Sequence, residues 1–449
     1  MPSTALDSAL FRDMFGTPAM RAVFADEALT GRYLEVEVAL ARAEARCGVI
    51  PAEAAEAIAA AAATLAFDWP RLKRETENVG YPILPLVHQL AEAAGEAGRW
   101  VHWGATTQDI MDTANVLQIR AALALVEADI AALRGILAGL ALKHRATPMA
   151  GRTHLQQALP ITFGYKVAIW LAAMDRHAER LAQLRPRVLV GEFAGAAGTL
   201  ASLGDQGFAV QAALCEELGL GVPAITWHVA RDGIAEAVGF LGLVTGTLAK
   251  VATDIMLMMS TEFGGEVMEP FVKGRGASST MPQKRNPISS ELMLATAKAV
   301  RQQVALVLDA MVQDFERATG PWHLEWLAVP ESFILSAGCL EQAKFALAGL
   351  TVDAPRMRQN LDMSGGLIVA EAVMMAAAPA LGRQHAHDVI YDACRAAIGA
   401  GKPLAEVLLD MPEVVAALGG EAAVRAACDP ANYLGLAPER VDRVLAGRG

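Results

Sequence analysis

Long apolar segments without proline alternate with short polar islands along this chain of 449 residues. Four segments are long enough for extended helices: Asp112–Arg145, Ile161–Leu184, Asp232–Glu262 and Ile288–Ala318. Their polar stripes are narrow, and a helix that is apolar nearly all round must be enclosed by other helices. We therefore expect a central bundle of long helices that is completed by association of subunits. A large monomeric bundle is the alternative.

The pattern changes on both sides of these segments. Residues 1–104 contain short amphipathic helices, with Pro51 at the start of one and Gly48 at the end of another. After about residue 350 the chain is rich in turns, and short helices follow to residue 449. The prediction is an all-α chain with an N-terminal domain at residues 1–104, a central long-helix domain at 105–349 and a C-terminal domain at 350–449.

Composition supports the helical interpretation and narrows the functional class. Apolar residues make up 54% and aromatic residues only 6%, which favours helices over strands. The net charge of −11 argues against a general nucleic-acid binder. The most apolar stretch, Ala237–Ala249, stops at Lys250 and is shorter than the about 20 residues that span a membrane. No secretory signal is visible at the N-terminus, so we expect a cytoplasmic protein without a membrane or nucleic-acid partner.

The first two polar islands carry groups suited to binding and proton transfer. In HWGATTQDIMDT, Thr106, Thr107 and Gln108 precede a long helix whose free N–H groups can bind a carboxylate, and ordinary helix caps are the alternative. In AGRTHLQQALPITFG, His154 lies among polar residues just before Pro160, where we expect the next helix to start. Histidine exchanges protons near neutral pH; a structural histidine is the alternative.

The third island, GASSTMPQKRNPISSE, sets serines, cations and an acid between two long apolar segments. Removing a proton beside a carboxylate creates an enolate dianion, which needs convergent positive groups and N–H donors. Lys284, Asn286 and a helix N-terminus after Pro287 would supply them. Ser278, on a loop made mobile by glycines, would act as a base only in that field. A serine-rich surface loop without chemistry is the alternative.

Together the three islands resemble the conserved regions of one known family. GASSTMPQKRNP resembles the G-S-S-x-M-P-x-K-x-N signature of the fumarase/aspartase superfamily, and GATTQDIMDT and GRTHLQQALPITFG resemble its two other regions, in the family's order. The C-terminal half, through ERATGPWHLEWLAVPE and RMRQNLDMSGGLIVAEAV, looks closest to 3-carboxy-cis,cis-muconate cycloisomerases and adenylosuccinate-lyase-like proteins. The resemblance covers nearly the whole chain, and no G-x-S-x-G, H-E-x-x-H or P-loop template points elsewhere.

The resemblance implies an all-α homotetramer of three-domain subunits, with each active site collecting the three regions from three subunits and no metal or organic cofactor. By position, Ser278 matches the serine base, and Lys284 and Asn286 match groups that hold a substrate carboxylate and stabilise the enolate. His154 and Glu291 match a His–Glu pair that assists the leaving group. The expected contacts of the dicarboxylate or tricarboxylate substrate also include Thr106 and Thr107 of an anion-binding turn, Gln108, Thr153, Gln156, Ser279, Met281, Arg32, Tyr33, His102 and Arg231. A surface arginine is the alternative for Arg32, and helix caps are the alternative for His102 and Arg231.

Two departures from the family pattern bear on the reaction. Ala277 replaces the usual glycine before the serines, which would stiffen the loop. The cycloisomerases that resemble this chain usually lack the pair that stands here as His154 and Glu291. A lyase that expels an amine has more use for such a proton donor. We therefore expect anti β-elimination from an N-substituted aspartate to give fumarate and an amine. Cycloisomerisation of 3-carboxy-cis,cis-muconate and a catalytically silent helical scaffold are the alternatives.

Overall fold

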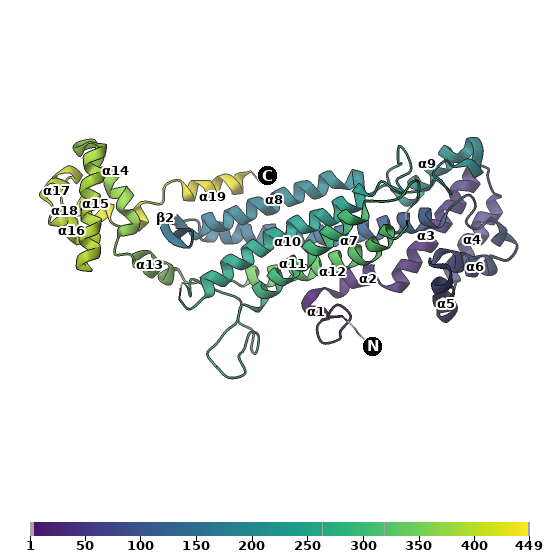
Figure 1. Ribbon diagram of the computed structural model, residues 1–449, viewed down its shortest axis with the longest axis horizontal. Coiled ribbons are helices and arrows are strands. Elements are labelled where there is room, and N and C mark those ends of the chain that lie inside the picture. Colours follow the sequence, from purple (N-terminus) through teal and green to yellow (C-terminus); the bar gives the residue numbers. More distant parts are fainter. Residues whose placement is uncertain (1–3, 263, 318, 448–449) are drawn as a thin grey trace. The chain divides into compact units, whose positions relative to one another are not determined.

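Most of the described chain is helical, as the composition predicts (Figure 1). The structure is a computed structural model that describes residues 4–262, 264–317 and 319–447. It contains two compact units, each built from three stretches of sequence. The first unit consists of Met1–Ile130, His177–Leu248 and Leu292–Glu341, and the second of Ala131–Arg176, Ala249–Glu291 and Gln342–Gly449.

Five long helices contribute residues to both units within the described ranges. They are α7 (Thr107–Lys143), α8 (Phe163–Val188), α10 (Asp232–Met259), α11 (Ile288–Ala310) and α12 (Pro321–Ala348). Because the two units interleave along the sequence, they do not test the predicted division at residues 104/105 and 349/350, which stays a prediction. The predicted homotetramer also stays a prediction.

The first unit holds the N-terminal helices, where α3 packs against α4 and α9 (Figure 1). Its main core cluster includes the fully buried Leu40, Ile110 and Phe193. Local sequence sets the helix ends: Asp68 caps the start of α5, and Gly80 closes it in the left-handed conformation. The elements wholly within this unit are α1 (Arg12–Phe15), α2 (Pro18–Val23), α3 (Asp26–Arg46), α4 (Ala52–Thr64), α5 (Trp69–Val79), α6 (Ile83–Ala94), η1 (Gly95–Trp100), η2 (Ala201–Gln206) and α9 (Gly207–Leu218).

The second unit holds the C-terminal helices and two small antiparallel sheets, β1–β2 and β3–β4. α14 packs against α15 and α17 around Val373, Leu404 and Leu408 (Figure 1). The elements wholly within this unit are β1 (Pro148–Thr153), β2 (Gln156–Thr162), β3 (Val267–Met268), β4 (Thr351–Val352), α13 (Ala354–Asp362), η3 (Leu367–Val369), α14 (Ala370–Leu381), α15 (Arg383–Ala400), α16 (Leu404–Leu409), α17 (Pro412–Leu418), α18 (Glu421–Ala427), η4 (Pro430–Asn432) and α19 (Ala437–Ala446).

The four predicted long helices are present, with shifted ends. α7 starts at Thr107 rather than at Asp112, and α11 ends at Ala310 rather than at Ala318. The prediction that Pro160 begins a helix is wrong, because this residue pairs with Ala150 in the β1–β2 hairpin. The sequence pattern also misses α12, which contains Pro330, since an internal proline argues against a continuous helix.

Among the described helices, α10 is the one that is long and apolar enough by itself to cross a membrane, with a mean hydropathy of 1.5 in its most apolar window. Within that window 61% of the residues are buried. Core helices pass the same test, and burial accounts for the apolar composition of α10. The bent pair α13 and Leu367–Leu381 also passes jointly, with an angle of 82° between its parts. These helices are therefore weak support for a membrane span.

One buried carboxyl group in the first unit has no hydrogen-bond partner among the described residues. Glu44 on α3 is fully buried, and both of its carboxyl oxygens are unpaired. Burial, and then the nearby charge of Glu37, raise the pKa of Glu44 to about 9. The group is therefore protonated at neutral pH in the folded chain.

The Glu44 side chain should make folding stability fall as the pH rises. Its folded pKa lies above the ordinary value of 4.5, so the folded state holds the extra proton between about pH 4.5 and pH 9. Unfolding releases that proton, at about 1.4 kcal/mol per pH unit. Relative to wild type, we expect the free energy of unfolding of Glu44→Gln to rise by roughly 3 kcal/mol between pH 6 and pH 8, measured by thermal unfolding. Glu53→Gln, an exposed acid on α4, is the control, and an equal difference at both pH values would contradict the assignment.

Candidate active site

The turn at the start of α7 is held by a reciprocal pair of hydrogen bonds. The Asp109 carboxylate accepts the Thr106 N–H at 2.9 Å, and the Asp109 N–H donates to the Thr106 carbonyl at 3.0 Å. This arrangement is a helix cap, so the capping interpretation holds for Asp109. The half-buried Thr106 and Thr107 lie at the same helix start, where N–H groups and the helix dipole favour a bound carboxylate.

Arg317 lies beside this turn and is a candidate that the sequence pattern hides. Its guanidinium donates to the Thr106 hydroxyl and, at 3.5 Å, to the Ala196 carbonyl. The apolar pattern predicts a helix through this position, whereas Arg317 follows α11 in a loop in which Phe315 has a φ of 44°. A guanidinium beside a helix start is well suited to a carboxylate.

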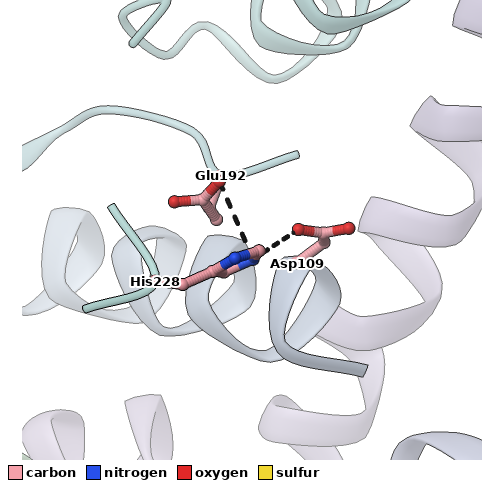
Figure 2. A group of neighbouring side chains, drawn as sticks. All are labelled: Asp109, Glu192 and His228. Atoms are coloured by element: carbon pink, nitrogen blue, oxygen red, sulfur yellow. Dashed lines mark hydrogen bonds and ion pairs between the residues drawn. The ribbon is translucent and has the colours of Figure 1, made fainter. Parts of the chain in front are cut away.

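Three fully buried side chains that are far apart in sequence meet behind this turn: Asp109, Glu192 and His228 (Figure 2). The His228 Nε2 atom lies 2.7 Å from an Asp109 oxygen and 3.8 Å from a Glu192 oxygen. Asp109 also accepts the N–H groups of Ala194 at 3.1 Å and Gly195 at 3.0 Å. The cluster ties the start of α7 to the glycine-rich segment after α8 and to the segment before α10.

The cluster does not fit a metal centre, although its ligand-type atoms lie within 4.8 Å of one another. The carboxylate oxygens of Asp109 and Glu192 already accept N–H or O–H groups. Burial lowers the pKa of His228, but its hydrogen bond to Asp109 and the charge of Glu192 outweigh this effect and raise it. Burial raises the pKa of Glu192 to about 7. The group is a hydrogen-bonded charge cluster that positions three segments.

Gln108 and Arg231 lie in the core with their donors taken up by neighbours, which favours a structural role over the predicted substrate contact. The Gln108 amide donates to the His228 carbonyl at 2.8 Å and to Asp112 at 3.0 Å. The Arg231 guanidinium is fully buried and makes hydrogen bonds to Asp112 at 2.6 and 2.9 Å and to Glu325 at 2.9 Å.

The other candidates in the first unit, Arg32, Tyr33 and His102, differ in burial and in their hydrogen-bond partners. Arg32 forms an ion pair with Glu35 on the same helix, whereas Tyr33 is only 3% exposed and lines a cavity. His102 is half-buried, has a φ of 62°, and its Nδ1 lies 2.6 Å from Glu37. Burial lowers the pKa of His102. The charge of Glu37 and its hydrogen bond to the ring outweigh the effect of burial, so the pKa of His102 is raised. A strained, charge-paired histidine four residues before Thr106 remains a candidate for substrate contact.

The second region is a β-hairpin with an exposed tip. Thr153 pairs with Gln156, so His154 and Leu155 form a two-residue turn. Their φ values are 52° and 62°, as in a type I′ turn, which prefers Asn and Gly. The side chains from Thr153 to Gln156 are all exposed. Such strain in non-glycine residues is typical of functional sites, and it presents His154 to solvent.

The third region is a loop between β3 and α11, as predicted. A bridge between Ala277 and Arg285 closes its base, together with a hydrogen bond from the Asn286 N–H to the Gly276 carbonyl at 2.9 Å. Gly276 has a φ of 69°, and a Cβ there would lie 2.5 Å from the Asn286 carbonyl oxygen. Only glycine fits this close approach.

Ser278 begins the tip of this loop, and its hydroxyl oxygen accepts the N–H groups of Thr280 at 3.3 Å and Met281 at 3.1 Å. Two N–H dipoles aimed at one oxygen stabilise negative charge on it, which a serine base requires. Glu291 is exposed in the first turn of α11. The remaining candidates of this loop are the exposed Ser279, Met281 and Lys284 and the half-buried Asn286.

Within single units, the structure brings some of the predicted residues together. Thr106 and Thr107 share one helix start in the first unit, beside Arg317, which the sequence did not predict. The residues of the Ser278 loop share a closed base in the second unit. The prediction that each site is shared by three subunits concerns the assembly, and it stays a prediction.

Comparison with known proteins identifies the family. The family model described as lyase matches residues 14–302, and the model for the adenylosuccinate lyase C-terminus matches residues 366–444. The chain belongs to the fumarase/aspartase superfamily. The resemblance of the three polar islands is thereby confirmed, and the chain is an enzyme of this superfamily.

Three relatives of this superfamily chain illustrate the range of reactions around it. The solved structure of a fumarate lyase from Mesorhizobium sp. BNC1 is 58% identical with a TM-score of 0.92, covering 97% of this chain and 99% of that chain. The 3-carboxy-cis,cis-muconate cycloisomerase of Pseudomonas aeruginosa is 48% identical over 97% of this chain and 96% of its own length. The N-acetyl-S-(2-succino)cysteine lyase of Dickeya dadantii is 39% identical over 99% of this chain and 98% of its own length.

Removing the Arg231 side chain should destabilise the fold rather than impair substrate binding alone. Arg231→Met would leave the buried carboxylates of Asp112 and Glu325 without their cation, at a cost of about 3–5 kcal/mol. The expected result is a lower unfolding midpoint in urea. The triple variant that adds Asp112→Asn and Glu325→Gln should recover part of the loss. An unchanged midpoint with a raised KM would instead identify a substrate-binding role.

Proposed function

We propose that this enzyme is a lyase that performs anti β-elimination on an N-substituted aspartate and releases fumarate and an amine. The observation that supports it best is the Ser278 hydroxyl, whose oxygen receives two backbone N–H groups on an accessible loop. Nearby Lys284 and Asn286 are suited to an enolate dianion. His154 and Glu291 stand at the positions of the family's His–Glu pair, which favours a reaction that needs a proton donor at the leaving group.

In the proposed reaction Ser278 removes the proton from Cβ, and the electron pair forms the enolate. The Cα–N bond then breaks, the double bond of fumarate forms, and His154, oriented by Glu291, donates a proton to the departing nitrogen. The Thr106 turn and Arg317 hold a carboxylate. The proposal includes a cytoplasmic homotetramer in which three subunits contribute to each site, without a metal or organic cofactor.

Cycloisomerisation of 3-carboxy-cis,cis-muconate is the second candidate. It is favoured by the 48% identity to the Pseudomonas aeruginosa cycloisomerase over nearly the whole of both chains. That reaction uses the substrate's own carboxylate to open or close a lactone. It therefore gives the exposed His154 and Glu291 no evident catalytic role.

A substrate screen separates the two candidates. Purified enzyme is incubated with N-substituted aspartates, succinylated thiols and 3-carboxy-cis,cis-muconate, and fumarate is followed by its ultraviolet absorbance. Fumarate from an aspartate derivative supports the first candidate. Loss of carboxymuconate without fumarate from any succinyl compound defeats it in favour of the second.

The Ser278→Ala variant should lose at least about 1,000-fold in kcat with little change in KM, because the base acts in the transition state and general-base steps contribute 10²–10⁴-fold. Gln283→Ala, at an exposed position of the same loop outside the candidate residues, is the control and should retain most of the activity. Equal activity of Ser278→Ala and wild type on the best substrate would remove Ser278 as the base.

A further inference from the structure

The second unit contains a cavity of about 110 Å³ between the hairpin that carries His154 and the helices α8 and α10. A single water needs only about 10–15 Å³, so the cavity has room for a ligand of several heavy atoms. Its lining side chains are Arg152 and Leu155 of the hairpin, Lys166 of α8, and Asp254, Leu257 and Met258 of α10. Three charged and three apolar side chains therefore line one space.

Two of the three charged lining residues are already paired. The Arg152 guanidinium donates to the fully buried carboxylate of Glu266 at 2.7 and 3.0 Å. Asp254 forms an ion pair with Lys250 and accepts the indole N–H of Trp170 at 3.2 Å. Within each ion pair the two charges cancel, so the electrostatic character of the cavity depends on the remaining charged residue.

That residue is Lys166, whose ammonium has no hydrogen bond or ion pair within residues 4–262, 264–317 and 319–447. The side chain is half-buried. Burial lowers the pKa of Lys166, and the opposite charges of Asp254 and Glu266 do not compensate for this effect. A cation that is partly removed from water without a counter-charge is unfavourable. An anionic ligand would supply the counter-charge.

The charge balance and the apolar wall together limit the kind of anion. The three cations and two carboxylates of this cluster leave a net charge of +1. One negative charge on a ligand balances Lys166, whereas a second carboxylate would meet repulsion from Asp254. The remaining lining residues, Leu155, Leu257 and Met258, suit an alkyl chain. These features favour a short alkyl monocarboxylate over a dicarboxylate.

The cavity adjoins the strained turn of the hairpin. Arg152 and Leu155 line it and lie on either side of His154 in the sequence. His154 and Leu155 both have a positive φ, and such backbone persists only where its surroundings hold it. A ligand between Lys166 and Leu155 would therefore contact the hairpin next to its most strained residues.

We propose that this cavity binds a short alkyl monocarboxylate, whose carboxylate accepts hydrogen bonds from the Lys166 ammonium and whose alkyl chain packs against Leu155 and Met258. The bound ligand holds the hairpin that presents His154 and reduces its local opening. The inference does not depend on which reaction the enzyme performs.

Calorimetric titration of the full-length enzyme with propionate, at constant pH and chloride concentration, tests the ligand class. We expect saturable binding whose dissociation constant rises at least about 10-fold in Lys166→Gln, because a charge-assisted hydrogen bond is lost. Lys166→Arg, which keeps the cation, should stay within about threefold of wild type. The control is Lys402→Gln, at an exposed lysine outside the cavity, and it should bind like wild type.

Two further probes separate charge from shape. The neutral 1-propanol should not bind, and fumarate should bind equally to wild type and Lys166→Gln. Propionate binding that is absent, or unchanged in Lys166→Gln, would show that the ammonium is simply hydrated or paired elsewhere, and it overturns the inference. Fumarate binding that depends on Lys166 overturns it as well.

Hydrogen exchange of the hairpin backbone tests the position of the ligand. At about ten times the dissociation constant, propionate should slow exchange in residues 152–157 about 10-fold in wild type and in Lys166→Arg. The same concentration should leave exchange unchanged in Lys166→Gln. Binding of propionate without slower exchange in this hairpin contradicts the proposed site.

Discussion

The Asp109 carboxylate is the interaction on which the first-unit site depends. It is fully buried, and it accepts hydrogen bonds from the N–H groups of Thr106, Ala194 and Gly195 and from the His228 ring. A buried carboxylate without such donors would cost several kcal/mol. Three segments far apart in sequence must therefore meet at this point for the chain to fold, and their meeting fixes the turn that starts α7.

Most of the non-glycine residues with left-handed backbone lie close to the candidate site residues. Of the described non-glycine residues, those with positive φ are His102, His154, Leu155, Leu200 and Phe315. His102 precedes the Thr106 turn, His154 and Leu155 form the hairpin tip, and Phe315 lies two residues before Arg317. Left-handed backbone in such residues costs energy and persists where the surrounding structure holds it. His102, His154 and Leu155 lie in polar islands, which supports the functional interpretation of these islands without using the family resemblance.

Solved structures that share this helical architecture carry the names of different reactions. Because a fold hosts many chemistries, the reaction must be argued from side chains at the site. In this chain the groups suited to proton removal lie on exposed turns and loops.

The sequence by itself determined the all-α class, four of the long helices and the three polar islands, because helix periodicity, proline positions and turn residues act over short stretches of chain. It could not decide which islands face solvent. It did not show that Gln108 and Arg231 make hydrogen bonds to Asp112, and Arg317 lay within an apolar pattern that predicted helix. The hairpin at His154 also depended on pairing of β1 with β2, which no single segment encodes. Burial and long-range hydrogen bonds arise only when distant segments meet, so the tertiary structure alone assigned these residues their surroundings.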